Sequence, residues 1–232
     1  MAGNSTRNAR LSHSWRLGQA KHEGMLDDYV HMARASLALY EQTSDERYLD
    51  YACAWTASLD RRFWDQDEGG YFFTADDAEA LIVRTKTVAD NAIPAGNAVM
   101  LEVLHNLYQA TGDPDYQARI QSLIGAFATT VAANPIGCAT FVNNFDTLSK
   151  GLQIIIIGDR PAEDTDALLK AISGQSLPGR IVEVVESEAN LVKEHPAKGK
   201  TRQEGKATAY VCQGQTCSIP ITDPSELTAF LA

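Results

Sequence analysis

The sequence predicts a mainly α protein, with a partial (α/α) toroid of helical hairpins over residues 1–150 and a small α/β subdomain over residues 151–232. Two observations predict this class. The segment 39–48, LYEQTSDERY, returns at 107–116 as LYQATGDPDY, and apolar residues at helical spacing flank both copies. Such a return indicates repeated supersecondary units. After Gly151 the pattern changes, because QIIII at 153–157 is typical of a buried strand.

The first predicted hairpin begins with a helix over about residues 27–41. Its apolar stripe recurs at three- and four-residue steps, and the members are Tyr29, Ala33, Leu37 and Tyr40. Ser44 and Asp45 are expected to end this helix and cap the next one. The second helix carries its own stripe, made of Tyr48, Ala52, Trp55 and Leu59.

The second predicted hairpin repeats this arrangement. Pro94 is expected in the first turn of its first helix, where the missing N–H costs nothing. Gly112, Asp113 and Pro114 are expected to be the C-cap, the N-cap and the first helical residue at the connection. A third, less regular helix is expected after Pro135.

The C-terminal part has a β-α-β pattern. The strand at 153–157 is followed by a helix near 164–173 and a second strand at 180–185. A third strand is expected at 207–211 and a closing helix at 225–231. The polar stretch 188–206, rich in Lys, Glu and Gly, is expected to be a mobile loop.

The composition excludes several classes of partner. A net charge of −10 argues against nucleic acid and anionic membranes, because phosphates require a basic face. No apolar run approaches a membrane span, and the polar N-terminus lacks the apolar stretch of a secretory signal. Four scattered cysteines suggest a reducing, cytoplasmic setting. No metal-ligand motif and no nucleotide or other cofactor motif is present, so we expect neither a metal nor a cofactor.

The insertion over residues 63–91 separates the two predicted hairpins and carries most of the candidate chemistry. It is expected to form two short extended pieces around the Gly69-Gly70 turn. Its aromatics and carboxylates predict a carbohydrate-binding rim, because aromatic rings stack on sugar C–H faces while carboxylates hold hydroxyls. The residues expected to bind substrate are Trp15, Tyr29, Trp64, Tyr71, Phe72, Lys86, Asn91 and Asn97.

Three carboxylates are the candidate catalytic groups: Asp28, Asp65 and Asp90. Asp28 belongs to an adjacent pair with Asp27, and paired carboxylates serve as acid and base when their pKa values are pushed apart. Each site also has a structural interpretation. The rim aromatics can plug the end of the helical unit, acidic residues at a helix start complement the helix dipole, and Asp90 and Asn91 can form turns.

The histidines and cysteines give weaker signals. An isolated N-terminal His13 is expected to be solvated, whereas His31 and His105 lie on helices whose other residues are core. Cys53 is expected to be a small buried hydrophobe. Cys212 and Cys217 have the wrong spacing for a thioredoxin-type CxxC pair. They can close a small disulfide, hold a turn by packing alone, or take part in redox chemistry.

A set of short motifs in order resembles the C-terminal part of thioredoxin-domain-containing proteins of the spermatogenesis-associated type. The motifs are SWR-x-G at 14–18, DDY at 27–29, FWD…GGYF at 63–72, D…IPAGN at 90–97, IIIGD at 155–159 and AYVC…C at 209–217. They span nearly the whole chain. One departure is Ala95, where a serine is expected, and the region 136–150 fits loosely.

The resemblance implies a thioredoxin-like domain followed by a six-hairpin toroid, similar to those of N-acylglucosamine 2-epimerases and six-hairpin glycosidases. This chain then starts inside the toroid, which makes it look like a fragment or a separately encoded half, without the thioredoxin cysteine pair. A thioredoxin-like domain or the missing toroid half is the expected partner, and a sugar is the expected ligand. We expect carbohydrate binding or processing by carboxylate acid/base chemistry; the alternative is a non-catalytic interaction or scaffold module that acts with a thioredoxin-like domain.

Overall fold

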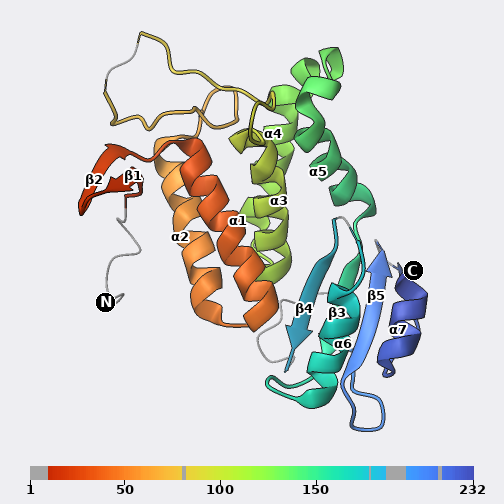
Figure 1. Ribbon diagram of the computed structural model, residues 1–232. Coiled ribbons are helices and arrows are strands. Elements are labelled where there is room, and N and C mark those ends of the chain that lie inside the picture. The colour runs from red at the N-terminus through yellow and green to blue at the C-terminus, as the bar shows by residue number, and fades with distance from the viewer. Residues whose placement is uncertain (1–9, 80–81, 178, 187–196, 214–215) are drawn as a thin grey trace. The chain divides into compact units, whose positions relative to one another are not determined.

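The computed structural model describes residues 10–79, 82–177, 179–186, 197–213 and 216–232 (Figure 1). The chain divides into two compact units. Unit 1 comprises Met1–Tyr108 and Asp113–Phe145, and unit 2 comprises Gln109–Gly112 and Asp146–Ala232. Unit 1 is built of helices joined by a long irregular segment, whereas unit 2 contains a four-stranded sheet. Each unit is described by itself.

An antiparallel hairpin that the sequence did not predict opens unit 1. Strands β1 (Ser12–Arg16) and β2 (Gln19–Glu23) pair around a turn at Leu17 and Gly18, whose φ angles are 52° and 76°. Nearly every residue of both strands is exposed. The apolar and polar alternation that marks a half-buried strand is therefore missing from the sequence.

The first helical hairpin consists of α1 (Leu26–Thr43) and α2 (Glu46–Arg62). Ser44 ends α1 in the left-handed conformation, with φ of 53°, and the Asp45 carboxylate accepts a hydrogen bond from the Arg47 N–H at 3.1 Å. The predicted end and cap are confirmed. Of the predicted stripes, Ala33 of α1 and Ala52 and Leu59 of α2 are fully buried. The ring centres of Tyr29 and Trp55 lie 5.9 Å apart, so the two stripes meet between the helices.

The second helical hairpin consists of α3 (Gly96–Thr111) and α4 (Pro114–Ala133). Gly112 has φ of 68°, Asp113 caps α4 through the Asp115 N–H, and Pro114 is the first helical residue, as predicted. The prediction for Pro94 is wrong. The carbonyl of Ala95 accepts the first hydrogen bonds of α3, so Pro94 precedes the helix. The Asp90 carboxylate accepts from the Ala95 N–H at 3.0 Å and fixes the start there.

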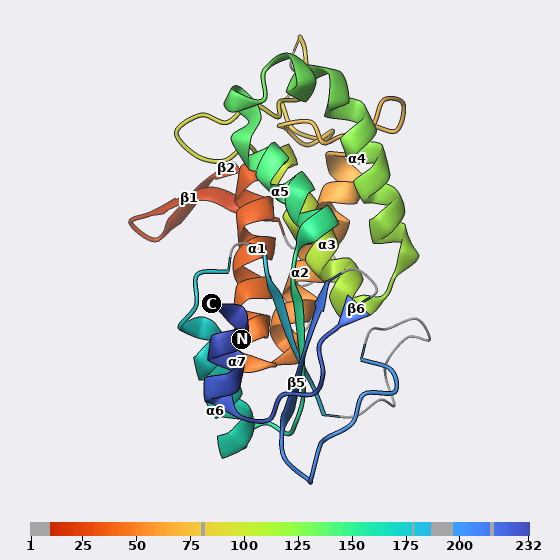
Figure 2. The ribbon, with the colours of Figure 1, turned by 90° about the vertical axis from the view of Figure 1, so that its right-hand side faces the viewer.

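A short 3₁₀ turn, η1 (Ile136–Cys138), and α5 (Ala139–Lys150) follow, as expected after Pro135. Figure 2 shows α1 and α2 running roughly along one direction, with the described parts of the irregular segment over residues 63–95 at one end. The described residues thus contain the two predicted hairpins and α5. The full toroid remains a prediction.

Unit 2 has a mixed sheet with strand order β4-β3-β5-β6. The central strand β3 (Gln153–Ile157) pairs in parallel with β4 (Ile181–Val185) and antiparallel with β5 (Thr208–Gln213), and β6 (Thr216–Cys217) extends β5. Helix α6 (Glu163–Ser173) connects the two parallel strands, and α7 (Pro224–Leu231) closes the chain. The predicted β-α-β pattern, third strand and closing helix are confirmed.

Alternate residues of β3 face two different cores. Ile154 and Ile156 pack with Leu168 and Ile172 of α6 and with Leu227 and Leu231 of α7. Ile155 and Ile157 pack with Val185, Ala197 and Tyr210 on the opposite face. Burial on both faces explains the continuous apolar run in the sequence. Of the predicted mobile loop 188–206, residues 188–196 lie outside the described residues. The remainder contacts β5, and the Tyr210 hydroxyl donates to the Thr201 carbonyl at 2.7 Å.

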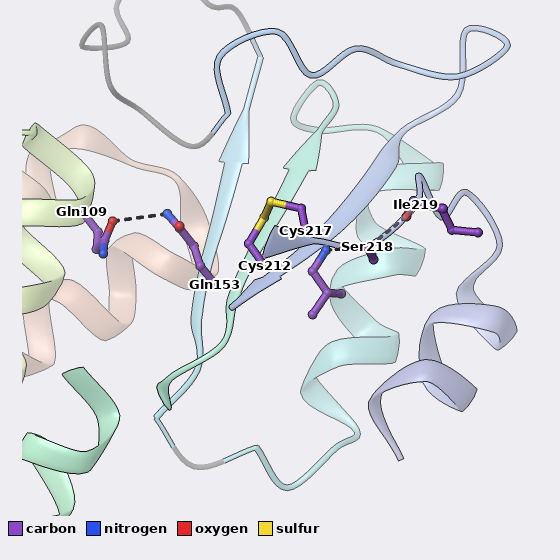
Figure 3. The surroundings of a disulfide bond; sticks show 7 residues. Gln109, Gln153, Cys212, Cys217, Ser218 and Ile219 are labelled. Atoms are coloured by element: carbon purple, nitrogen blue, oxygen red, sulfur yellow. Dashed lines mark hydrogen bonds between the residues drawn. A yellow bond between two sulfur atoms is a disulfide. The ribbon is translucent and has the colours of Figure 1, made fainter. Parts of the chain in front are cut away.

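A disulfide joins Cys212 of β5 to Cys217 of β6 (Figure 3). This confirms the interpretation that the two cysteines close a small disulfide. The two cysteines are paired residues of adjacent strands, so the bridge closes the end of a hairpin. Cys53 is only partly buried in α2, where burial raises the pKa of its thiol.

Candidate functional site

The predicted rim residues lie at the end of unit 1 where α1 and α3 begin. The irregular segment over residues 63–95 is tied to both helix starts, as can be followed in Figure 1. The Leu26 N–H donates to the Phe73 carbonyl at 3.0 Å. The Asn97 side chain, fully buried, accepts from the Tyr71 N–H at 2.8 Å and donates to the carbonyls of Tyr71 and Thr87, each at 2.9 Å. Asn97 therefore fixes the segment to α3.

Asp27 and Asp28 are adjacent in the first turn of α1 but occupy different environments. The Asp28 carboxylate accepts from the Met25 N–H at 2.8 Å and lies 2.9 Å from His13 Nδ1 in the β1–β2 hairpin. The Asp27 carboxylate instead accepts from the Gly96 N–H, and burial raises its pKa. Gly96 is needed for this approach, because an added Cβ would lie 2.5 Å from Asp27 Oδ1. His13 is exposed, as expected, and its ring also lies against the Asp28 carboxylate.

Asp65 holds the tip of the segment together. Its carboxylate lies 2.5 Å from Lys86 Nζ, and both side chains are largely buried. The same carboxylate accepts from the backbone N–H groups of Asp67 and Glu68. These interactions, led by Lys86, lower the pKa of Asp65. Lys86 Nζ also lies 5.2 Å from the centre of the Phe72 ring, so Lys86, Phe72 and Asp65 form one cluster.

Asp90 has a different set of partners. Its carboxylate accepts from the Ala95 N–H at 3.0 Å and from the Thr140 N–H at 2.8 Å. It therefore joins the start of α3 to the start of α5. Neighbouring Asn91 is exposed, and its N–H donates to the Ile93 carbonyl. The three predicted catalytic carboxylates thus have three separate sets of partners.

The predicted aromatic platform is largely buried. Tyr71 is fully buried and packs edge-on against Trp64, with ring centres 4.8 Å apart. Tyr29 is 3% exposed and packs on Phe63. Trp15 is 74% exposed on the β1–β2 hairpin. The structure therefore brings Trp64, Tyr71 and Asn97 together, and Asp65, Lys86 and Phe72 together. Tyr29 packs on Phe63 and Trp55 instead, whereas Trp15 and Asn91 are exposed.

A cavity of about 480 Å³ lies between α2 and α4, and sequence reasoning missed it. We call it the α2–α4 pocket. Its lining residues are Ala57, Asp60, Trp64, Asp113, Asp115, Tyr116, Ala118, Arg119 and Ser122. Only Trp64 among them was predicted to bind a ligand. Asp60 and Arg119 occupy positions in ordinary helical patterns. The sequence signal that could have indicated a pocket was therefore only a charged residue beside an apolar stripe.

The α2–α4 pocket contains a linked polar cluster. The Tyr71 hydroxyl donates to Asp60 Oδ1 at 2.7 Å, and Arg119 Nε lies 3.4 Å from the same atom. The Arg119 guanidinium lies 4.0 Å above the Trp64 ring. Burial raises the pKa of Asp60 and outweighs the lowering effects of Tyr71 and Arg119. Near the pocket, Tyr116 contacts Cys53.

Neither a metal centre nor a membrane span was found in the described part of the chain. No group of three or more potential metal-ligating side chains occurs there. None of the described helices combines the length and the apolar character that crossing a bilayer requires.

The fold consists of a helical-hairpin unit and an α/β unit. Comparisons with known proteins show which sequences this chain resembles. No family model matches it. It is 34% identical to human spermatogenesis-associated protein 20 and 32% identical to the mouse protein, each over 213 residues that cover 90% of this chain. The chain spans 27% of the length of these relatives. It is therefore homologous to part of spermatogenesis-associated protein 20, as the resemblance predicted.

Among solved structures, the chain is similar to a GH76 alpha-mannanase of Bacteroides thetaiotaomicron. The TM-score is 0.45 at 15% identity, over 59% of this chain and 38% of the other.

Proposed function

We propose that unit 1 binds and processes a carbohydrate at the start of α1, with Asp27 and Asp28 as the acid/base pair. The observation that supports this proposal is the unlike environment of two adjacent carboxylates. Burial raises the pKa of Asp27, whereas the Asp28 side chain is 26% exposed and faces His13. Glycoside hydrolysis uses two carboxyl groups in different environments, one of which keeps its proton and serves as the acid.

The two aspartates have different roles in this proposal. Asp27 remains protonated to a higher pH than an ordinary aspartate and donates a proton to the leaving oxygen. Asp28 acts as the base or nucleophile, with His13 Nδ1 2.9 Å from its carboxylate. Asp65 and Asp90, predicted to be catalytic, position the surrounding segment instead through Lys86 and through backbone N–H groups.

The test is turnover of a panel of 4-nitrophenyl glycosides by the purified chain and by two variants, Asp27→Asn and Asp28→Asn. We expect each variant to lose about a hundredfold or more in kcat/KM, the usual contribution of a positioned acid or base. Activity of the unaltered chain should fall as pH rises through the raised pKa of Asp27, because the proton donor is then lost. The matched control is Asp67→Asn, an exposed aspartate of the same unit.

Two results would contradict the proposal. One is equal activity in the control and both variants. The other is no turnover and no saturable binding of any glycoside by the unaltered chain, which would favour the interaction-module alternative.

A further inference from the structure

The α2–α4 pocket has a lining that no part of the proposed acid/base chemistry uses. It shares no lining residue with the Asp27 and Asp28 site. Its volume of about 480 Å³ lies within the range of small-molecule sites. The pocket combines hydrogen-bond donors from Arg119, Tyr116 and Ser122 with the Asp60 carboxylate as an acceptor.

We propose that the α2–α4 pocket binds a neutral polyhydroxylated ligand, roughly one or two sugar rings in size, through Asp60 and Arg119. A sugar hydroxyl both donates and accepts a hydrogen bond, so neighbouring hydroxyls need an acceptor beside a donor. Asp60 and Arg119 supply this pair 3.4 Å apart. The planar guanidinium presents several N–H groups in a fixed fork, which suits adjacent oxygens.

The charges of the pocket argue against an anionic ligand. Among the described residues that line the cavity, Asp60, Asp113 and Asp115 are acidic and Arg119 is cationic, and the charge of neighbouring Arg61 also acts on Asp60. Arg119 already lies against Asp60, so its charge is balanced within the protein. An added anion would approach a site whose net charge is negative and would be repelled.

A cationic ligand is also disfavoured. The favourable position for a cation is above the face of an aromatic ring and close to a carboxylate. Arg119 occupies that position, 4.0 Å above Trp64 and next to Asp60. An external amine would have to displace the guanidinium to reach the position between Trp64 and Asp60. A neutral polyol can bind beside Asp60 and Arg119 without breaking their contact.

The geometry around Asp60 is fixed before a ligand arrives. Tyr71 is fully buried and its hydroxyl donates to Asp60 Oδ1 at 2.7 Å. Asn97 in turn holds the Tyr71 backbone on both sides. Tyr71 is thus a positioning residue, and the carboxylate loses little conformational freedom when a ligand binds.

The test uses the indole N–H signals of the chain's three tryptophans in two-dimensional NMR spectra. Trp64 lines the pocket, Trp15 lies on the exposed β1–β2 hairpin, and Trp55 packs against Tyr29. The probes are glucose, mannose, cellobiose and myo-inositol, with inorganic phosphate as the anion and spermidine as the cation. We expect the neutral probes to shift the Trp64 signal saturably while the Trp15 and Trp55 signals stay in place.

Substitutions of pocket residues test whether the ligand binds in the α2–α4 pocket. Asp60→Asn and Arg119→Lys should each weaken binding about tenfold or more, the usual loss when a hydrogen bond to a charged group is removed. Asp50→Asn, at an exposed position of the same helix α2, should bind like the unaltered chain. Thermal unfolding checks that each variant is folded. If Asp60→Asn proves unstable, Arg119→Lys still tests the pocket, because it keeps the positive charge and removes only the planar fork of N–H groups.

Three outcomes would overturn this inference: a Trp64 shift with spermidine or phosphate but not with the neutral probes, no Trp64 shift with any probe, or unchanged binding in both pocket variants. The experiment also separates this site from the proposed function. A Trp64 shift that persists in Asp27→Asn supports the pocket even if glycoside turnover is absent. A shift abolished by Asp27→Asn but not by Asp60→Asn overturns the pocket and leaves the proposed function standing.

Discussion

At the scale of single residues, the polar side chains of unit 1 divide into those with fixed partners and those in contact with solvent. Asn97 is fully buried and holds three backbone groups, whereas Asn91 is exposed. Both belong to the polar segment that the sequence marks as a candidate binding region. The distinction matters because a buried polar group that loses its partner pays the full cost of desolvation.

We therefore predict that Asn97→Ala lowers the free energy of unfolding by about 3 kcal/mol, because the Tyr71 N–H and two carbonyls lose their buried partner. Urea unfolding followed by circular dichroism measures the change. Asn91→Ala, the exposed control, should stay within about 0.5 kcal/mol. Equal effects of the two substitutions would show that Asn97 does not hold the segment.

At the scale of elements, the Gly69-Gly70 turn sets the shape of the segment that covers the helix starts. Both glycines have positive φ, 74° and 79°, and the turn joins the paired residues Trp64 and Tyr71. A Cβ on Gly70 would lie 2.9 Å from Phe127 Cε2 of α4. The turn thus requires glycine both for its backbone conformation and for its contact with the helix.

Gly70→Ala should destabilise the protein by about 1–2 kcal/mol or more from the left-handed conformation alone, and the clash with Phe127 adds to it. The matched change is Gly125→Ala, inside α4, where an added Cβ meets nothing within 4 Å. That change should stabilise by about 0.5–1 kcal/mol, because alanine favours the helix over glycine. Denaturant midpoints measure both, and effects of the same sign would contradict this account of the turn.

At the scale of the whole molecule, each unit contains its own buried apolar side chains. Leu101 of α3 is fully buried in unit 1, and Ile156 of β3 is fully buried in unit 2. Ile156 packs with the residues of α6 and α7 rather than with those of the helical hairpins. Local opening of each unit should therefore be more sensitive to substitutions in its own core than to substitutions in the core of the other unit.

Leu101→Ala and Ile156→Ala should each destabilise the unit that contains them by about 2–5 kcal/mol, as expected for a cavity in a packed core. Hydrogen–deuterium exchange read by mass spectrometry locates the effect. Leu101→Ala should raise exchange mainly in α1–α4, and Ile156→Ala mainly in the sheet and in α6 and α7. A uniform rise across the chain in both variants would show that the two units open together.

The sequence by itself determined the elements whose signals are local. The cap at Asp45, the Gly112-Asp113-Pro114 connection and the buried strand at 153–157 are where their residues predict, because capping and periodicity depend on neighbours within a turn or two. The β1–β2 hairpin escaped prediction because its strands bury no face. Pro94 was misplaced because the Asp90 carboxylate accepts from the Ala95 N–H and fixes the start of α3 beyond the proline.

Only the tertiary structure decided which polar groups have partners and which line a cavity. The sequence marked Asp65 and Asp90 as candidates by their residue type. Their partners Lys86 and Thr140 come from distant parts of the chain. Asp60 and Arg119 lie in separate helices and meet only when α2 and α4 pack. The pKa of a carboxyl depends on burial and on such distant neighbours, so the chemistry of this chain is set by contacts that no local pattern records.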